Sequence, residues 1–162
     1  MEAIFSPGAA WHPVSERLRT MRRVLILVWS AVLGITAAVA IGLLLGWWWL
    51  SAIIVLVSAG SAVWGWFWAA RNQRAWGYAE NDDDLYVRSG VAWRRIVAVP
   101  YGRVQFVDVE AGPLERAYGI ATVSLHTASS ETSAQIPGVP ADEASRLRDR
   151  LTELGKTHGA GI

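Results

Sequence analysis

One stretch of the sequence limits the possible folds more than any other: the residues from Val24 to Ala70 include no Asp, Glu, Lys, Arg or His over 47 positions. A helix rises about 1.5 Å per residue and the hydrocarbon core of a bilayer is about 30 Å thick, so one span needs roughly 20 apolar residues. The stretch is long enough for two spans and too short for three. We therefore expect a transmembrane hairpin over 24–70, with helices at about 24–46 and 47–70 and a tight turn at Gly46.

The residues that border this hairpin predict its orientation. Tryptophan favours the membrane interface, and clusters of it mark both ends of the second span: Trp47, Trp48, Trp49, Trp64, Trp66 and Trp68. Basic residues flank the two outer ends, whereas the turn has none: Arg22, Arg23, Arg71 and Arg74. Cytoplasmic flanks carry the excess of positive charge. We expect a multi-pass protein of the bacterial cytoplasmic (inner) membrane with both termini in the cytoplasm. The Arg-rich, Lys-poor composition of the chain is typical of a bacterium with a GC-rich genome.

The segment before the hairpin, residues 1–23, is interpreted as amphipathic and juxtamembrane. Its apolar residues recur every three or four positions, which is typical of one helix face: Trp11, Val14, Leu18 and Met21. This helix either lies in the interface or extends the first span. Small residues within the spans allow the two helices to pack on each other, or two copies of the chain to form a homo-oligomer: Gly34, Gly42, Gly60 and Gly65.

After Arg74 the pattern changes to short, alternating apolar runs with turn signals about every ten residues. Such runs predict antiparallel strands, here around 85–87 and at 91–100, 104–109, 120–127 and, more weakly, 132–136. An apolar stripe then predicts one closing helix with Gly155 as its C-cap: Ala144, Leu147, Leu151 and Leu154. We expect a small, mainly-β cytoplasmic domain at 75–155, a bent antiparallel sheet or barrel capped by the C-terminal helix, and a disordered tail at 156–162.

Two motifs within this domain carry a family resemblance. Pro100-Tyr101-Gly102-Arg103-Val104-Gln105 is followed by Gly112-Pro113-Leu114-Glu115-Arg116, and Arg88-Ser89-Gly90 precedes both. Together with the two preceding spans, they resemble the bacterial PH-like family typified by YdbS-like membrane proteins, over residues 11–154. The resemblance implies two membrane helices followed by a pleckstrin-homology-like barrel capped by a helix. It also implies a protein partner, such as a larger membrane protein with repeated PH-like domains.

The titratable residues of the chain do not form a catalytic set. Cysteine is absent, and His12, His126 and His158 lie far apart without metal-binding spacing. The acidic run 82–84 is typical of a turn, because neighbouring carboxylates seldom converge on one ion. We therefore expect no enzyme activity, no cofactor and no metal. A net charge of +1 without a basic run argues against nucleic acid.

Four arginines are candidates for binding an anion or an acidic partner loop through the planar guanidinium fork: Arg94, Arg95, Arg103 and Arg116. The alternative is a structural role, in which Arg103 or Arg116 pairs with a turn carbonyl or with a nearby carboxylate of Asp108, Glu110 or Glu115. We favour this structural role. The range 75–155 carries eight arginines and twelve acids, a net charge of −4. An anionic leaflet repels such a domain as a whole.

Two classes of function remain. The first is a membrane-anchored interaction or scaffold module, one subunit of a larger membrane complex. The second is a membrane protein that recognises lipid head groups or assists export or resistance. We favour the first, because the excess of acids disfavours strong binding to anionic lipids. Membrane lipids surround the hairpin in both cases.

Overall fold

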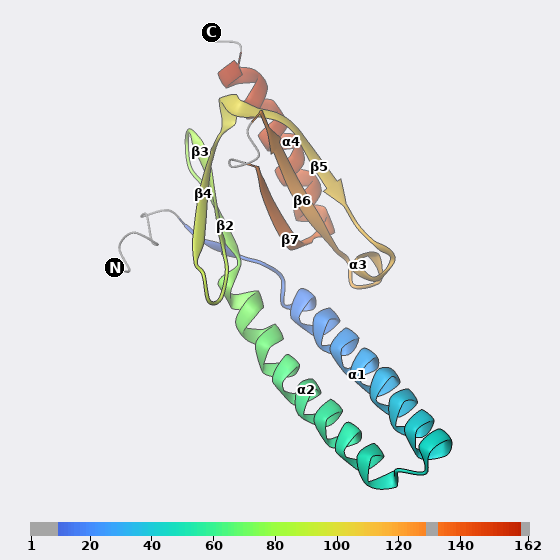
Figure 1. The fold of residues 1–162 in the computed structure, drawn as a ribbon. Coiled ribbons are helices and arrows are strands. Elements are labelled where there is room, and N and C mark those ends of the chain that lie inside the picture. Colours follow the sequence, from blue (N-terminus) through green and yellow to red (C-terminus); the bar gives the residue numbers. More distant parts are fainter. Residues whose placement is uncertain (1–9, 129–132, 160–162) are drawn as a thin grey trace. The chain divides into compact units, whose positions relative to one another are not determined.

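A computed structural model of the protein describes residues 10–128 and 133–159 (Figure 1). The chain forms two compact units. One unit is the helical segment Arg19–Arg71, and the other combines the residues up to Leu18 with those from Asn72 onward. The second unit therefore takes residues from both sides of the hairpin, whereas the sequence predicts a domain confined to 75–155.

The helical unit is built from α1 (Glu16–Leu45) and α2 (Trp48–Ala75), both long and apolar enough to cross a membrane. Gly46 makes the turn between them with a φ of 69°, in the left-handed region that favours glycine. Because α1 begins at Glu16, residues 16–23 extend the first span. This is one of the two arrangements that the sequence allows for the juxtamembrane segment.

Small residues bring the two helices of the hairpin together. A Cβ added at Gly34 would overlap the Ser58 side chain, and one at Gly65 would lie 2.6 Å from Ile26 Cγ2. The hydroxyl of Ser58 also donates a hydrogen bond of 2.6 Å to the carbonyl of Ser30. Packing within the hairpin thus accounts for Gly34, Gly42 and Gly65. A Cβ at Gly60, the fourth of these glycines, would meet open space.

The first sheet of the domain has the order β1–β2–β3–β4, with antiparallel neighbours. Its strands are β1 (His12–Pro13), β2 (Gly77–Glu80), β3 (Asp84–Ser89) and β4 (Arg95–Pro100). Since β1 pairs with β2, the whole membrane hairpin is the connection between two neighbouring strands (Figure 1).

The N-terminal strand corrects the predicted helix face. Trp11 and Val14 precede α1, and Pro13 lies in the sheet, where it disfavours helix for the residue before it. The helix begins after Ser15, whose hydroxyl oxygen accepts the Arg17 N–H at 3.2 Å, as an N-cap does. The sequence pattern from Trp11 to Met21 therefore crosses a strand, a short connection and a helix start.

The second sheet has the order β5–β6–β7. A short 3₁₀ turn, η2 (Tyr101–Arg103), leads from β4 into β5 (Val104–Glu110), and α3 (Pro113–Ala117) connects β5 to β6 (Ile120–Thr127). Strand β7 (Ala134–Pro140) runs four residues beyond the predicted end at Ile136, directly into the final helix. Residue 132, where this strand was predicted to start, lies outside the described residues.

Helix α4 (Ala141–Gly159) closes the domain, and its predicted apolar stripe is confirmed. Ala144, Leu147 and Leu151 are fully buried. The helix does not end at Gly155, because that residue lacks the positive φ of a left-handed cap. It continues to Gly159, through part of the predicted tail. Two antiparallel sheets and a closing helix make up the mainly-β, PH-like fold that the sequence predicts.

Candidate ligand and partner surfaces

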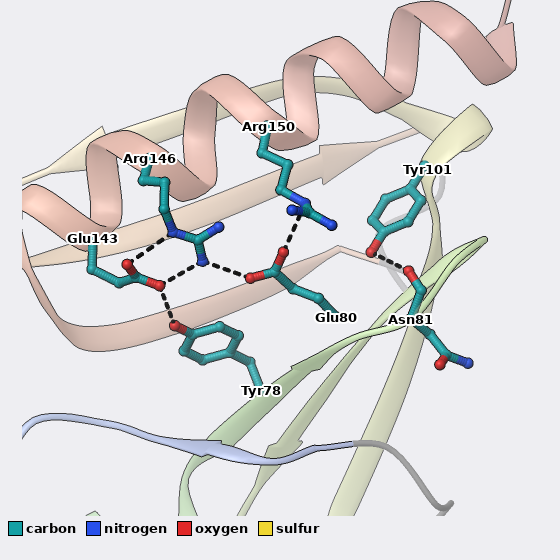
Figure 2. A network of polar contacts seen from close by, with 7 residues as sticks. All are labelled: Tyr78, Glu80, Asn81, Tyr101, Glu143, Arg146 and Arg150. Carbon is teal, nitrogen blue, oxygen red and sulfur yellow. Dashed lines mark hydrogen bonds and ion pairs between the residues drawn. The ribbon is translucent and has the colours of Figure 1, made fainter.

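Two arginines of α4 hold the helix on the first sheet (Figure 2). Glu80, at the end of β2, forms ion pairs with Arg146 at 2.7 Å and with Arg150 at 3.0 Å. Glu143 accepts from the same Nη2 of Arg146 at 2.6 Å and from its Nε at 2.9 Å, and it also accepts the Tyr78 hydroxyl at 3.0 Å. Because the Glu80 side chain is only 14% exposed, it lies in the contact between helix and sheet.

The electrostatics of this network indicate a structural role. Burial, followed by the hydrogen bond to Glu143, raises the pKa of Tyr78 to about 12. The hydrogen bond from Arg146 lowers the pKa of Glu143, and the two carboxylates raise the pKa of Arg146 in turn. Opposite charges on these side chains stabilise each other's ionised forms. The network is therefore engaged internally rather than poised to bind a ligand.

The four candidate arginines do not converge on one site. Arg94 is exposed at the tip between β3 and β4, and Arg95 is the first residue of β4. The length of β4 separates both from Arg103 in η2, while Arg116 lies exposed on α3. A single anion could therefore contact Arg94 or Arg95 together with their neighbours, but the structure provides no cluster of all four.

The contacts of the described residues include no ion pair that joins Arg103 or Arg116 to Asp108, Glu110 or Glu115, so their structural pairing stays a prediction. Glu115 contacts other groups instead: its Oε2 accepts the Gly112 N–H at 2.9 Å and its Oε1 accepts the Thr122 hydroxyl at 3.0 Å. The carboxylate folds back because Glu115 occupies the third position of α3, where it caps the helix start.

A cavity of about 310 Å³ lies between the two sheets. Strands β3, β4, β6 and β7 line it, together with Trp76, and its polar side chains come from positions far apart in the sequence: Ser89, Arg95, Ser124, His126, Ser133 and Gln135. In the sequence, His126 alternates with the apolar residues of its strand, which predicts an outward or polar position. In the structure its ring is half-buried and stacks on Phe106, with 4.3 Å between the ring centroids.

The edge of the second sheet forms a different kind of surface. Within the described residues, β5 pairs with β6 alone, so its other side is open. Phe106 on β5 is 57% exposed, and Leu114 on the neighbouring α3 is 49% exposed. Asp108 and Glu110 are also exposed on this strand. Asp108 Oδ1 accepts the Val109 N–H at 2.8 Å, so one backbone donor of β5 is already bonded. The surface thus combines a strand edge that no second strand covers with apolar and acidic side chains.

Most of the predicted interface residues of the hairpin are exposed, whereas Arg22 and Arg23 are half-buried. All six tryptophans of the two clusters are exposed, Trp47 in the turn and the other five on α2. Arg23 lies over the Trp66 ring, 4.2 Å from its centroid, and donates a hydrogen bond of 3.4 Å to the Trp66 carbonyl. Arg71 and Arg74 are exposed near the end of α2. No group of three or more His, Asp or Glu residues able to hold a metal ion is found among the described residues.

The chain belongs to the family described as Bacterial PH domain, whose pattern matches residues 23–155, hairpin included. It is a membrane protein with a bacterial PH domain. Over 83 residues it is 37% identical to the transmembrane protein YdbS of Bacillus subtilis (strain 168). That match covers 51% of each chain, so this protein spans about half the length of that relative. No solved structure matches the chain. The family resemblance that the motifs at 100–105 and 112–116 indicate is confirmed.

Proposed function

We propose that this protein is a membrane-anchored interaction module that acts as a scaffold and forms one subunit of a larger membrane complex, with both termini in the cytoplasm. The open edge of β5 carries the proposal. An unpaired strand edge accepts an extended segment of another protein through backbone hydrogen bonds. Phe106 and Leu114 beside that edge supply the apolar contacts that such an interface needs.

The charges beside the edge indicate which partner segment would suit it. Asp108 and Glu110 are exposed on β5, so they favour a segment with basic side chains at matching positions. Like-charged segments would be rejected, which gives the edge some specificity. A larger membrane protein with its own PH-like domains offers strands and edges of this kind.

Purification of the full chain from native membranes tests this proposal. A protein partner should co-purify in a fixed ratio, and the variants Phe106→Ser and Leu114→Ser should lose it. Both side chains are exposed, so these variants should keep the fold. Thr152→Ala, on the exposed face of α4, is the matched control and should keep the partner. A partner that both serine variants retain would refute the role of the β5 edge.

Recognition of a lipid head group is the second candidate function, favoured by the cavity between the sheets. Its volume of about 310 Å³ lies at the small end of the range for ligand pockets. Arg95, Ser124 and His126 line it with a cation and hydrogen-bonding groups. Native mass spectrometry of the full chain would detect one bound anionic lipid, which Arg95→Ala should release. Bound lipid without any protein partner would favour this function over the scaffold.

A further inference from the structure

The turn between β3 and β4 carries a surface that the β5 edge does not explain. Trp93 lies in this turn, residues 90–94, here called the β3–β4 tip. Its side chain is 88% exposed, more than any other large apolar side chain among the described residues. Arg94 and Arg95 follow it directly, and both are exposed. An indole held in water beside two guanidinium groups contributes nothing to the core of the domain.

The charge around this tip differs from that of the domain as a whole. No Asp or Glu occurs between Leu85 and Val107, whereas four arginines do: Arg88, Arg94, Arg95 and Arg103. The acids of the first sheet are concentrated around the turn between β2 and β3, with Asp82 and Asp83 in the turn and Asp84 as the first residue of β3. The net charge of −4 is therefore an average over a segment without acids, 85–107, and an acidic run at 82–84.

The strand register places the β3–β4 tip, with Arg88, Arg94 and Arg95 in or beside it, at the opposite end of the first sheet from the acidic turn (Figure 1). Arg103 is not part of this basic end, because it follows Pro100, which pairs with Asp84. Gly77 pairs with Arg88, so the β3–β4 tip extends beyond the first residue of β2. The chain reaches that residue from the last turn of α2, residues 72–75, which belongs to the same compact unit. The acidic turn follows Glu80 at the other end of β2. The aromatic, basic tip thus lies at the end of the sheet that joins the membrane helix.

We propose that the β3–β4 tip contacts the lipid surface of the bilayer that α1 and α2 span. Trp93 would place its apolar ring in the interface while its N–H bonds to water or lipid carbonyls. Arg94 would pair with a lipid phosphate, whose geometry suits the guanidinium fork. Gly90 makes the tight turn possible, because its φ of 96° favours glycine and a Cβ there would overlap the Trp93 carbonyl.

This contact is compatible with a domain that binds anionic vesicles weakly on its own. The membrane helix keeps the tip at a high effective concentration near the surface, so one tryptophan and one or two arginines suffice to populate the contact. It is also separate from the β5 edge, and it neither requires nor excludes a protein partner there. One interface would orient the domain, and the other would bind the partner.

Fluorescence quenching in the full chain tests the proposal. Because the chain has no cysteine, Ala92→Cys provides a single site for an environment-sensitive dye at the tip. Asp82→Cys places the same dye on the acidic turn as the matched control. The labelled chains are reconstituted in nanodiscs of phosphatidylcholine and phosphatidylglycerol that contain a lipid spin-labelled near its head group. We expect a blue-shifted, strongly quenched emission from position 92 and little quenching at position 82.

Second variants identify the groups responsible. Trp93→Ser combined with Arg94→Gln should reduce quenching at position 92 to the level of position 82, while circular dichroism stays unchanged. Phe106→Ser should leave the quenching as it is, so a failure of the β5 proposal remains distinguishable. Equal quenching at positions 92 and 82 would overturn the inference, since a tip that faces solvent or awaits a protein partner gives that result. Quenching that survives the double substitution would overturn it as well.

Discussion

Replacing Leu18 with alanine should destabilise the C-terminal domain, although the helical unit Arg19–Arg71 separates the two in sequence. Leu18 is 2% exposed, and a Cβ added at Gly138 on β7 would lie 2.7 Å from its side chain. The backbone is fixed there too, because the Ser15 N–H donates to the Gly138 carbonyl at 2.9 Å. Truncation of a buried leucine to alanine costs about 2–5 kcal/mol. We expect a loss of about 3 kcal/mol at this site.

The measurement needs the domain without its membrane helices. Residues 10–18 can be joined to residues 72–159 by a Gly/Ser linker that replaces 19–71. The two pieces lie close together, since the Gln73 side-chain amide donates to the Val14 carbonyl at 2.8 Å. Urea unfolding followed by circular dichroism then gives the free energy of unfolding by linear extrapolation. A loss of about 3 kcal/mol corresponds to a fall in Tm of roughly 12–24 °C for a domain of this size.

Arg17→Ala is the control for this experiment, one residue away. Arg17 is exposed, and its guanidinium reaches the Tyr118 carbonyl only at 3.4 Å, so its loss should cost no more than about 0.5 kcal/mol. Equal stabilities of the Leu18→Ala and Arg17→Ala chimeras would refute the reasoning. So would a chimera lacking residues 10–18 that unfolds at the same temperature as the complete one. Either result would mean that the N-terminal segment lies outside the core of the domain.

Three further predictions follow from single positions. Gly155→Ala should stabilise the domain by about 0.5–1 kcal/mol in thermal unfolding, because the residue lies inside α4 without a positive φ and a Cβ there meets only ordinary contacts; a lower Tm would contradict this. Trp47→Cys, exposed at the hairpin turn, should react with an impermeant thiol reagent on intact cells, whereas Thr152→Cys on α4 should react only after lysis; the opposite pattern would reverse the predicted topology. The pKa of Tyr78 rises from about 10 in the unfolded chain to about 12 in the fold. The neutral hydroxyl therefore stabilises the fold fully below pH 10, and this contribution to the free energy of unfolding is lost as the pH rises towards 12. Tyr78→Phe should flatten part of this decline when urea unfolding is measured at alkaline pH, and identical profiles for the two proteins would exclude the effect.

The membrane hairpin and the closing helix were predictable because each depends on a local pattern. A run of 47 uncharged residues is stable only out of water, and its length alone sets the number of helices. The stripe through Leu147 and Leu151 repeats at the helical period, so it predicts both the helix and its buried face. The arginine motifs added the PH-like architecture through the family that carries them.

Strand boundaries were less predictable where one residue changes the backbone. The apolar run after Gly90 predicts a strand from Val91, yet β4 begins at Arg95 because Gly90 turns the chain with a positive φ. Gly155 shows the reverse: a glycine read as a helix end lies within the helix. Composition alone does not distinguish a glycine that terminates an element from one that the element tolerates.

The contacts that define the candidate surfaces were decided by tertiary structure alone. A strand of two residues shows no periodicity, so the pairing of His12–Pro13 with β2 could not be read from the sequence. The sequence left Glu115 as a possible partner of an arginine, whereas in the fold its carboxylate accepts from the Gly112 N–H and the Thr122 hydroxyl. The cavity likewise exists only where four strands meet. The sequence determined that the chain enters a membrane and carries a PH-like domain, because hydrophobic length and helical period are local properties. Which residues the domain buries, pairs or leaves exposed depended on long-range packing, since those contacts join positions that both membrane helices or whole strands separate.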